Sequence, residues 1–226
     1  MKVIVTGATG QAGREVVQHC IDSPQITKVV ILTRRAVCGD VESHPKIEVV
    51  MQQDFSHYPE AVLRRLEGAE ACLWTIGSRA DQAKHDKEAD RRVGVEFPIT
   101  AARTLCAHVA EKATPPSDAA PFRFIFCSSK HASRSRKPLL FASDTRRLAA
   151  EAEKGLLEVA DGSGGRFETY ILRPAAFRAA ASDARNAQAA NGPPTMRAAQ
   201  VGRAMVSVAC NGRKGRLIEN EALEAM

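Results

Sequence analysis

The sequence predicts an α/β fold with a doubly wound, mostly parallel sheet of about six to seven strands and helices on both faces. Three observations support this class. The strand-like segments are almost continuously apolar, as a sheet covered on both faces requires. Strand and helix patterns alternate from residue 2 to about residue 210, which is typical of right-handed crossover connections. The chain also opens on a short strand, a glycine-rich turn and a helix.

The expected strands are short apolar or β-branched runs, several of which end at a turn residue. The run 3–5 leads into Thr6-Gly7, and the run 71–76 is followed by Gly77. In chain order the expected strands cover residues 3–5, 29–32, 47–51, 71–76, 122–127 and 168–172, and residues 216–218 can add an edge strand.

The expected helices carry apolar residues at helical spacing, such as Val16, Val17 and Cys20 on one side of the first. They cover residues 11–22, 58–67, about 86–112, 144–160 and about 197–210. Two stretches interrupt the alternation: a loop at 113–121 and a variable loop or lid at about 178–195. We expect a single domain over residues 1–226, with a minimal C-terminal substrate region, because only about 50 residues follow the sixth strand.

Composition excludes several classes of protein. With 44% hydrophobic and 26% charged residues, the chain is neither disordered nor fibrous. The net charge of +6 favours anionic partners but falls short of a dedicated nucleic-acid binder. The six scattered cysteines show no metal-ligand spacing, so we expect free thiols and no metal site. Without a membrane-length apolar run or a signal-peptide core, a soluble cytoplasmic protein is expected.

The strongest motif is the glycine turn from Thr6 to Gly13, read TGATGQAG, which follows the first strand and opens the first helix. Gly7 permits a sharp turn, Gly10 lets a pyrophosphate approach the backbone, and Gly13 allows close packing of helix on strand. The helix N-terminus offers free N–H groups to phosphates. This context indicates a Rossmann dinucleotide site. The alternative is a turn that binds nothing; a P-loop is excluded because no Gly-Lys-Ser/Thr follows.

The second strand ends in Thr33-Arg34-Arg35, where a protein that binds NAD usually carries an acidic residue. After this strand, no carboxylate occurs until Asp40. Arg34 can present a planar fork to a 2′-phosphate, and Arg35 can stack on adenine or add charge. We therefore expect NADP(H) to be preferred over NAD(H). The alternative is two solvated loop arginines.

On these motifs the chain resembles the atypical short-chain dehydrogenase/reductases, nearest the NmrA-like and Tat-interacting-protein-like group of NAD(P)-binding Rossmann proteins. The turn is the specific part; weaker similarities follow the later strands. The resemblance implies Asp54 and Phe55 beside the adenine, and Ser128 and Ser129 near the nicotinamide ribose. The full set of expected cofactor-binding residues is Gly7, Thr9, Gly10, Gln11, Ala12, Gly13, Arg34, Arg35, Asp54, Phe55, Thr75, Ile76, Gly77, Ser128, Ser129, Pro174 and Ala175.

The chain departs from that family where catalysis is concerned. Active members of the wider family use a Tyr four residues before a Lys as general acid/base. Here Tyr58 and Tyr170 are the two tyrosines, and neither precedes a Lys at that distance. Phe141 and Arg147 fall where the pair would be sought, and neither can supply a proton near neutral pH.

The remaining catalytic candidates are Ser128 and His131, just past the fifth strand. Ser128 could hold a substrate carbonyl, and His131 titrates near neutrality and could protonate it. The alternative is a polar loop in which Ser128 binds ribose and His131 faces water.

Three functions remain open. The first is an NADPH-dependent oxidoreductase that reduces a carbonyl-type small molecule without a Tyr/Lys pair. The second is a non-catalytic NADP(H)-sensing regulatory protein that binds a protein partner. The third is nucleic-acid binding through basic loops such as 134–137, which the 5% aromatic content disfavours. Expected partners are therefore a nicotinamide dinucleotide and an unidentified substrate or protein, with no membrane.

Overall fold

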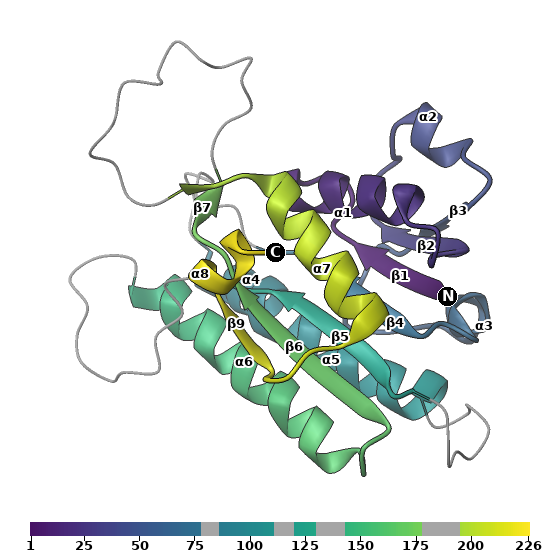
Figure 1. Cartoon of the computed structure of the whole chain (residues 1–226). Helices are drawn as coiled ribbons and strands as arrows, with labels where there is room; N and C mark the ends of the chain where they lie inside the picture. The colour runs from purple at the N-terminus through teal and green to yellow at the C-terminus, as the bar shows by residue number, and fades with distance from the viewer. Residues whose placement is uncertain (78–85, 111–119, 130–142, 178–194) are drawn as a thin grey trace.

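Seven parallel strands form one sheet in the order β3-β2-β1-β4-β5-β6-β9 (Figure 1). The computed structural model describes residues 1–77, 86–110, 120–129, 143–177 and 195–226. Every neighbouring pair of strands in this sheet is parallel. The direction of winding reverses between β1 and β4, so the sheet is doubly wound, and the predicted fold class is confirmed.

The observed strands begin and end within two residues of the expected ones. The strands are β1 (Lys2–Thr6), β2 (Lys28–Thr33), β3 (Ile47–Met51), β4 (Ala71–Trp74), β5 (Phe122–Cys127), β6 (Phe167–Arg173) and β9 (Leu217–Glu219), with β7 (Ala176–Phe177) and β8 (Thr195–Met196) as a separate parallel pair. The helices are α1 (Gln11–Asp22), α2 (Gly39–Glu42), α3 (Glu60–Leu66), α4 (Lys87–Arg91), α5 (Phe97–Leu105), α6 (Ser143–Gly162), α7 (Ala198–Asn211) and α8 (Asn220–Glu224).

The helix expected at about 86–112 is continuous but not uniformly α-helical. Two π-helical turns, η1 (Arg92–Glu96) and η2 (Cys106–Ala110), flank α5. The elements α2, α8, β7 and β8 could not be predicted from the sequence, because elements of two to five residues are too short to show a period. The expected lid at about 178–195 lies outside the described residues, apart from its last position.

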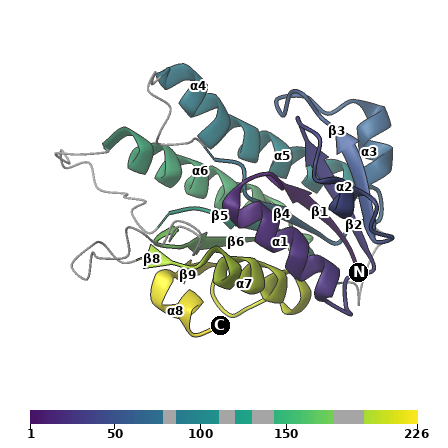
Figure 2. The same cartoon turned by 90° about the horizontal axis from the view of Figure 1, so that it is seen from above.

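Two layers of helices cover the sheet, with α3, α5 and α6 on one face and α1, α7 and α8 on the other (Figure 2). The first face buries aromatic side chains such as Trp74, Phe124 and Phe167. The second buries mainly aliphatic residues, including Val16 and Met205. The apolar runs of β1, β2, β4 and β5 are thus explained, because their side chains are buried on both faces.

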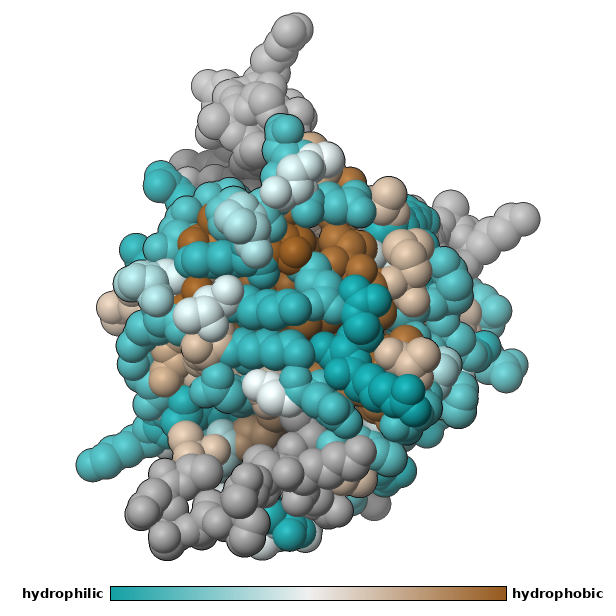
Figure 3. Space-filling view, turned by 90° about the vertical axis from the view of Figure 1, so that its right-hand side faces the viewer, coloured by the Kyte–Doolittle hydropathy of each residue, from teal (hydrophilic) through white to brown (hydrophobic). Residues whose placement is uncertain are grey.

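The edge strand β3 lies on the side shown in Figure 3, where hydrophilic surface predominates and apolar side chains show between polar ones. Glu48 in β3 pairs with Lys28 and Arg65. Charged side chains on an edge strand oppose pairing with another chain. Burial opposes ionisation of Glu48, but hydrogen bonds from Lys28 and Arg65 outweigh it and lower the pKa of this carboxyl.

Candidate cofactor site

The carboxyl ends of β1, β4 and β5 meet at one edge of the sheet, beside the point where the winding reverses. In open α/β sheets, ligands bind outside the carboxyl ends of the strands, at such a point. Each segment expected to bind the cofactor directly follows one of the strands from β1 to β6. The fold therefore brings these segments to the same edge.

The glycine turn is packed too closely to accept side chains at two positions. Gly7 has φ +73°, and a Cβ there would lie 2.5 Å from Oγ1 of Thr75. A Cβ on Gly13 would lie 2.0 Å from the carbonyl oxygen of Gly7. At Gly10 the nearest contact of such a Cβ is at 3.3 Å, so this position is less confined by the protein. Gly7 and Gly13 thus serve the packing, whereas Gly10 leaves space for a ligand.

Helix α1 begins without a side-chain cap. Gly10 is the N-cap residue, its N–H donates to the carbonyl oxygen of Gly7 at 2.9 Å, and no acidic residue lies in the first turn. The next residues are Gln11, which is exposed, and Ala12, which is buried; Thr9 before them is half-buried. Uncapped first-turn N–H groups and the helix dipole favour an anion at this point. The turn therefore fits the pyrophosphate of a dinucleotide.

Arg34 and Arg35 lie at the carboxyl end of β2, and both are exposed. Oγ1 of Thr33 accepts from the Arg35 N–H at 3.1 Å and donates to the Arg35 carbonyl oxygen at 2.8 Å. Gln53 donates to the Arg34 carbonyl oxygen at 3.3 Å. Within the described residues neither guanidinium forms an ion pair. The backbone is thus held while both side chains remain available to an anion.

Asp54 and Phe55 follow β3 but point to different environments. Asp54 is exposed; it accepts from the Ser56 N–H at 2.9 Å and pairs with Arg92 at 3.2 Å. The Ser56 hydrogen bonds and Arg92 together lower the pKa of this carboxyl. The ring of Phe55 is 1% exposed and packs edge-on against Trp74, so it belongs to the core. A contact between Phe55 and adenine would have to come from its backbone.

The segment after β4 lies against the glycine turn. Oγ1 of Thr75 donates to the carbonyl oxygen of Thr6 at 2.6 Å, which ties the ends of β1 and β4 together. Ile76 packs on the aromatic core, and Gly77 is exposed. These residues thus lie beside the glycine turn at the carboxyl end of β4.

A polar network around one buried carboxylate occupies the ends of β5, β6 and β9. Oγ of Ser128 donates to Oε1 of Glu153 at 2.6 Å, and Glu153 on α6 is fully buried. Arg173 meets both oxygens of that carboxylate, with Nε at 2.9 Å and Nη2 at 2.5 Å. Its Nη1 also reaches Glu219 at 2.9 Å. The hydrogen bond with Glu153 is the main reason why the pKa of Arg173 is raised.

The turn after β6 is fixed from the C-terminal part of the chain. The Ala175 N–H donates to Oδ1 of the buried Asn220 at 2.8 Å. Pro174 and Ala175 are buried, and Ser129 is half-buried after β5. The network and this turn together support the segments expected beside the nicotinamide.

Neither tyrosine is placed as a general acid at this network. Tyr58 is buried in the aromatic cluster, where desolvation raises its pKa well above the ordinary value. Tyr170 donates to Glu168 and accepts from the Arg213 N–H. The residue four positions before Glu153 lies on the same face of α6, but it is Ala149, whose side chain has no proton to donate. Arg147 is exposed, and His131 and Phe141 lie outside the described residues.

Several residues of this edge were not identified as site residues from the sequence. Arg173 and Glu219 lie in motifs that the resemblance singled out, but Glu153 and Arg92 gave no signal of their own. Their roles depend on partners 20 to 46 residues away in the sequence.

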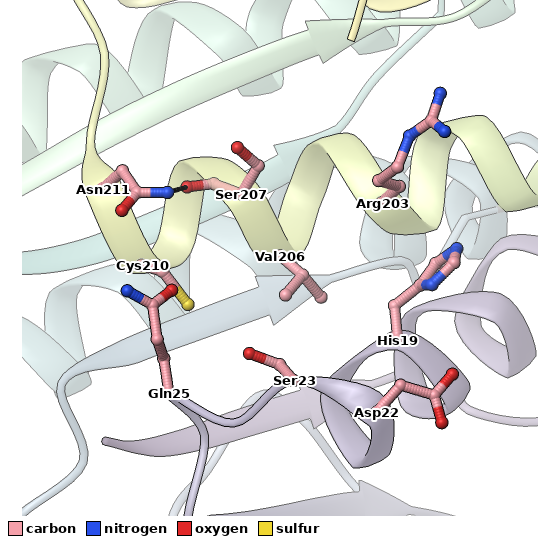
Figure 4. A pocket seen from close by; sticks show the side chains of 9 residues that line it. All are labelled: His19, Asp22, Ser23, Gln25, Arg203, Val206, Ser207, Cys210 and Asn211. Carbon is pink, nitrogen blue, oxygen red and sulfur yellow. Dashed lines mark hydrogen bonds between the residues drawn. The ribbon is translucent and has the colours of Figure 1, made fainter.

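A shallow pocket of about 330 Å³ lies elsewhere, between the C-terminal ends of α1 and α7 (Figure 4). His19, Arg203 and Cys210 are among its lining residues. It is separate from the carboxyl edge of the sheet. Among the described residues no group of His, Cys, Asp or Glu is suited to hold a metal ion. Nor does that part of the chain contain a helix long and apolar enough to cross a membrane.

Comparison with protein families decides the class of this chain. Residues 7–212 match the family model described as NAD(P)H-binding. The chain belongs to this NAD(P)H-binding family. The match begins at Gly7, in the glycine turn, and ends one residue after α7. The fit of the glycine turn to a dinucleotide and the family assignment therefore agree.

Known proteins are similar to this chain in sequence or in structure. The leucinostatins biosynthesis cluster protein T of Purpureocillium lilacinum is 26% identical in an alignment 198 residues long that covers 81% of this chain and 68% of that protein. A short-chain dehydrogenase from Burkholderia cenocepacia in complex with NADP has a TM-score of 0.73 at 16% identity, covering 99% of this chain and 90% of that one. A yeast methylglyoxal/isovaleraldehyde reductase complexed with NADPH has a TM-score of 0.70 at 14% identity, covering 97% and 78%. The NAD(P)H-binding chain thus has the fold of these reductases.

Proposed function

We propose that this NAD(P)H-binding protein is a reductase of a small molecule and that it prefers NADP(H) to NAD(H). The observation that carries the cofactor preference is the pair of exposed arginines at the end of β2, neither ion-paired within the described residues. A carboxylate there would bind a ribose hydroxyl and repel a phosphate, whereas an arginine can bind a 2′-phosphate.

In this proposal the glycine turn holds the pyrophosphate, through the first-turn N–H groups of α1. Asp54 lies on the adenine side, and Thr75, Ile76 and Gly77 border the middle of the dinucleotide. Ser128, Ser129, Pro174 and Ala175 face the nicotinamide half. When bound, the reduced nicotinamide supplies a hydride.

The chain's own residues then orient the cofactor and the substrate. Ser128 and His131 remain the candidate catalytic residues, and His131 lies outside the described part of the chain. General acid catalysis contributes roughly 10²–10⁴-fold, so without a Tyr/Lys pair the reduction of simple ketones is expected to be slow. Positioning of the hydride relative to the substrate provides the rest of the rate acceleration.

The test is the oxidation of NADPH across a panel of carbonyl and imine compounds, with tight NADPH binding verified first by calorimetry. Turnover of any member supports a reductase. Tight NADPH binding without turnover of any compound would contradict the proposal and favour the NADP(H)-sensing regulator. Turnover that survives both Ser128→Ala and His131→Ala would remove these two residues from the mechanism.

A further inference from the structure

The hydroxyl group of Ser128 has a defined hydrogen-bonding direction. A serine hydroxyl has one proton to donate and two lone pairs. Glu153 is fully buried and both its oxygens are paired with Arg173, so it is an ionised carboxylate that only accepts. At 2.6 Å the proton between Ser128 and Glu153 therefore belongs to the serine and points into the protein.

It follows that Ser128 can only accept a hydrogen bond from a molecule at the carboxyl edge of the sheet. Its backbone N–H is also committed, to the carbonyl oxygen of Leu172 at 2.7 Å. To donate to a carbonyl oxygen, the hydroxyl would have to leave a buried carboxylate with one hydrogen bond fewer. Leaving a buried charged acceptor unsatisfied is costly, so this rearrangement is disfavoured.

The network also carries a negative charge. Two carboxylates, Glu153 and Glu219, surround one guanidinium, that of Arg173. Arg173 is 11% exposed and Glu219 is 46% exposed, so the excess charge lies toward the open side of the network. A negative potential favours a cation over a neutral carbonyl at the adjacent position.

We propose that this edge selects a protonated imine, an iminium ion with an N–H group, rather than a ketone or aldehyde as substrate. This inference rests on the proposed function and specifies its substrate class. The iminium N–H donates to Oγ of Ser128, and the iminium charge lies beside the network.

An iminium substrate also removes the need for a general acid, which the Tyr/Lys pair would otherwise supply. The iminium carbon accepts the hydride with its electron pair, and the C–H bond at C4 of the reduced nicotinamide breaks. The π pair of the C=N bond becomes the lone pair on nitrogen, which gives the neutral amine and the oxidised dinucleotide. No proton is transferred from the protein in this step, because the substrate already carries it. A site without Tyr/Lys is therefore sufficient for this reaction.

The first test is a binding experiment with NADP⁺-saturated protein and three bicyclic probes of similar size. Tetrahydroisoquinolinium offers charge and N–H groups, its N,N-dimethyl salt offers charge alone, and tetralone offers a carbonyl oxygen. We expect tetrahydroisoquinolinium to bind roughly ten-fold more tightly than the dimethyl salt, as a hydrogen bond to a charged group implies. Tetralone is expected to bind most weakly. Tetralone binding as tightly as the cation would overturn the inference.

Ser128→Ala should abolish the difference in affinity between the two cations, measured at a concentration of NADP⁺ that saturates the variant. Ser207→Ala, at a half-buried serine on α7 near the opposite end of the sheet, is the matched control and should leave this difference intact. Glu153→Gln should raise the relative affinity for tetralone, since an amide releases the hydroxyl to turn. If Ser128→Ala weakens NADPH binding and leaves the difference between the cations intact, the serine contacts the cofactor ribose and the inference is wrong.

Activity provides a second measurement, independent of the first. We expect dihydroisoquinoline to be reduced at least ten-fold faster than tetralone by the wild type with NADPH. Faster reduction of tetralone would overturn the imine assignment while the reductase proposal stands. Failure to bind NADPH would instead overturn the proposed function itself.

Discussion

Substitutions at Gly13 and Gly10 should separate the packing of the glycine turn from its binding of the cofactor. In Gly13→Ala the new Cβ lies 2.0 Å from the Gly7 carbonyl oxygen and 2.5 Å from its carbon. An ordinary contact begins at 3.4 Å, so helix and turn must separate by about 1.4 Å, and backbone on both sides resists this. Overpacking of this kind costs about 1–3 kcal/mol, and we expect the upper end.

The assay is thermal unfolding with and without NADPH. A loss of about 3 kcal/mol lowers the Tm by roughly 6–12 °C in a chain of this length. At Gly10 the backbone is extended, with φ −81°, and the nearest contact of an added Cβ is at 3.3 Å. Gly10→Ala should therefore lower the free energy of unfolding by less than about 1 kcal/mol. NADPH should stabilise Gly10→Ala far less than the wild type, because the methyl group occupies the space of the pyrophosphate, and Gly10→Val should not bind NADPH at all.

Two results would refute this reasoning. An unchanged Tm for Gly13→Ala would show that the helix does not pack against the turn as closely as the structure indicates. Undiminished stabilisation of Gly10→Val by NADPH would show that the pyrophosphate lies elsewhere.

Two further predictions concern stability. Glu153→Ala should lower the free energy of unfolding by denaturant by about 3 kcal/mol, because it leaves the guanidinium of Arg173 with Glu219 as its remaining partner in the network. Replacement of the exposed Glu151 on the same helix by Ala should change this free energy little. Equal losses in the two variants would contradict the network. The pKa of Glu48 is lowered in the folded protein, so its contribution is present above the ordinary value of 4.5 and is lost as pH falls through the folded value. As the pH falls below 4.5, the free energy of unfolding should therefore decline more steeply in the wild type than in Glu48→Gln. Parallel curves of this free energy against pH would show that the ion pairs are unimportant.

The sequence was sufficient for the sheet because its strands are buried on both faces and therefore read as apolar runs. The segment from Thr6 to Gly13 could be interpreted as a dinucleotide site because each of its glycines meets a local steric requirement. The network could not be predicted, because Glu153 is one of several acidic residues on α6 and only the three-dimensional register with Arg173 and Ser128 distinguishes it. The resemblance implied Phe55 beside the adenine, but it could not predict that the ring of this residue packs in the aromatic core.

The interaction between Arg92 and Asp54 illustrates the same limit. The resemblance implied Asp54 beside the adenine, but the sequence did not show that Arg92, from the π-helical turn, pairs with its carboxylate. The guanidinium of Arg92 also lies 5.5 Å from the ring centroid of Phe97. Arg92 is distant in sequence from Asp54, so it can be assigned to the site only when the position of the helix after β4 relative to the end of β3 is known.

The most direct measurement for the central claim is the affinity of the wild type and of Arg34→Ala for NADPH and NADH, by calorimetric titration. We expect the wild type to bind NADPH more tightly. Arg34→Ala should weaken NADPH binding by about 1.5–3 kcal/mol, the value of a hydrogen bond to a charged group, and leave NADH nearly unchanged. Equal affinities of the wild type for both cofactors would contradict the claim, and so would a variant that keeps the full preference for NADPH.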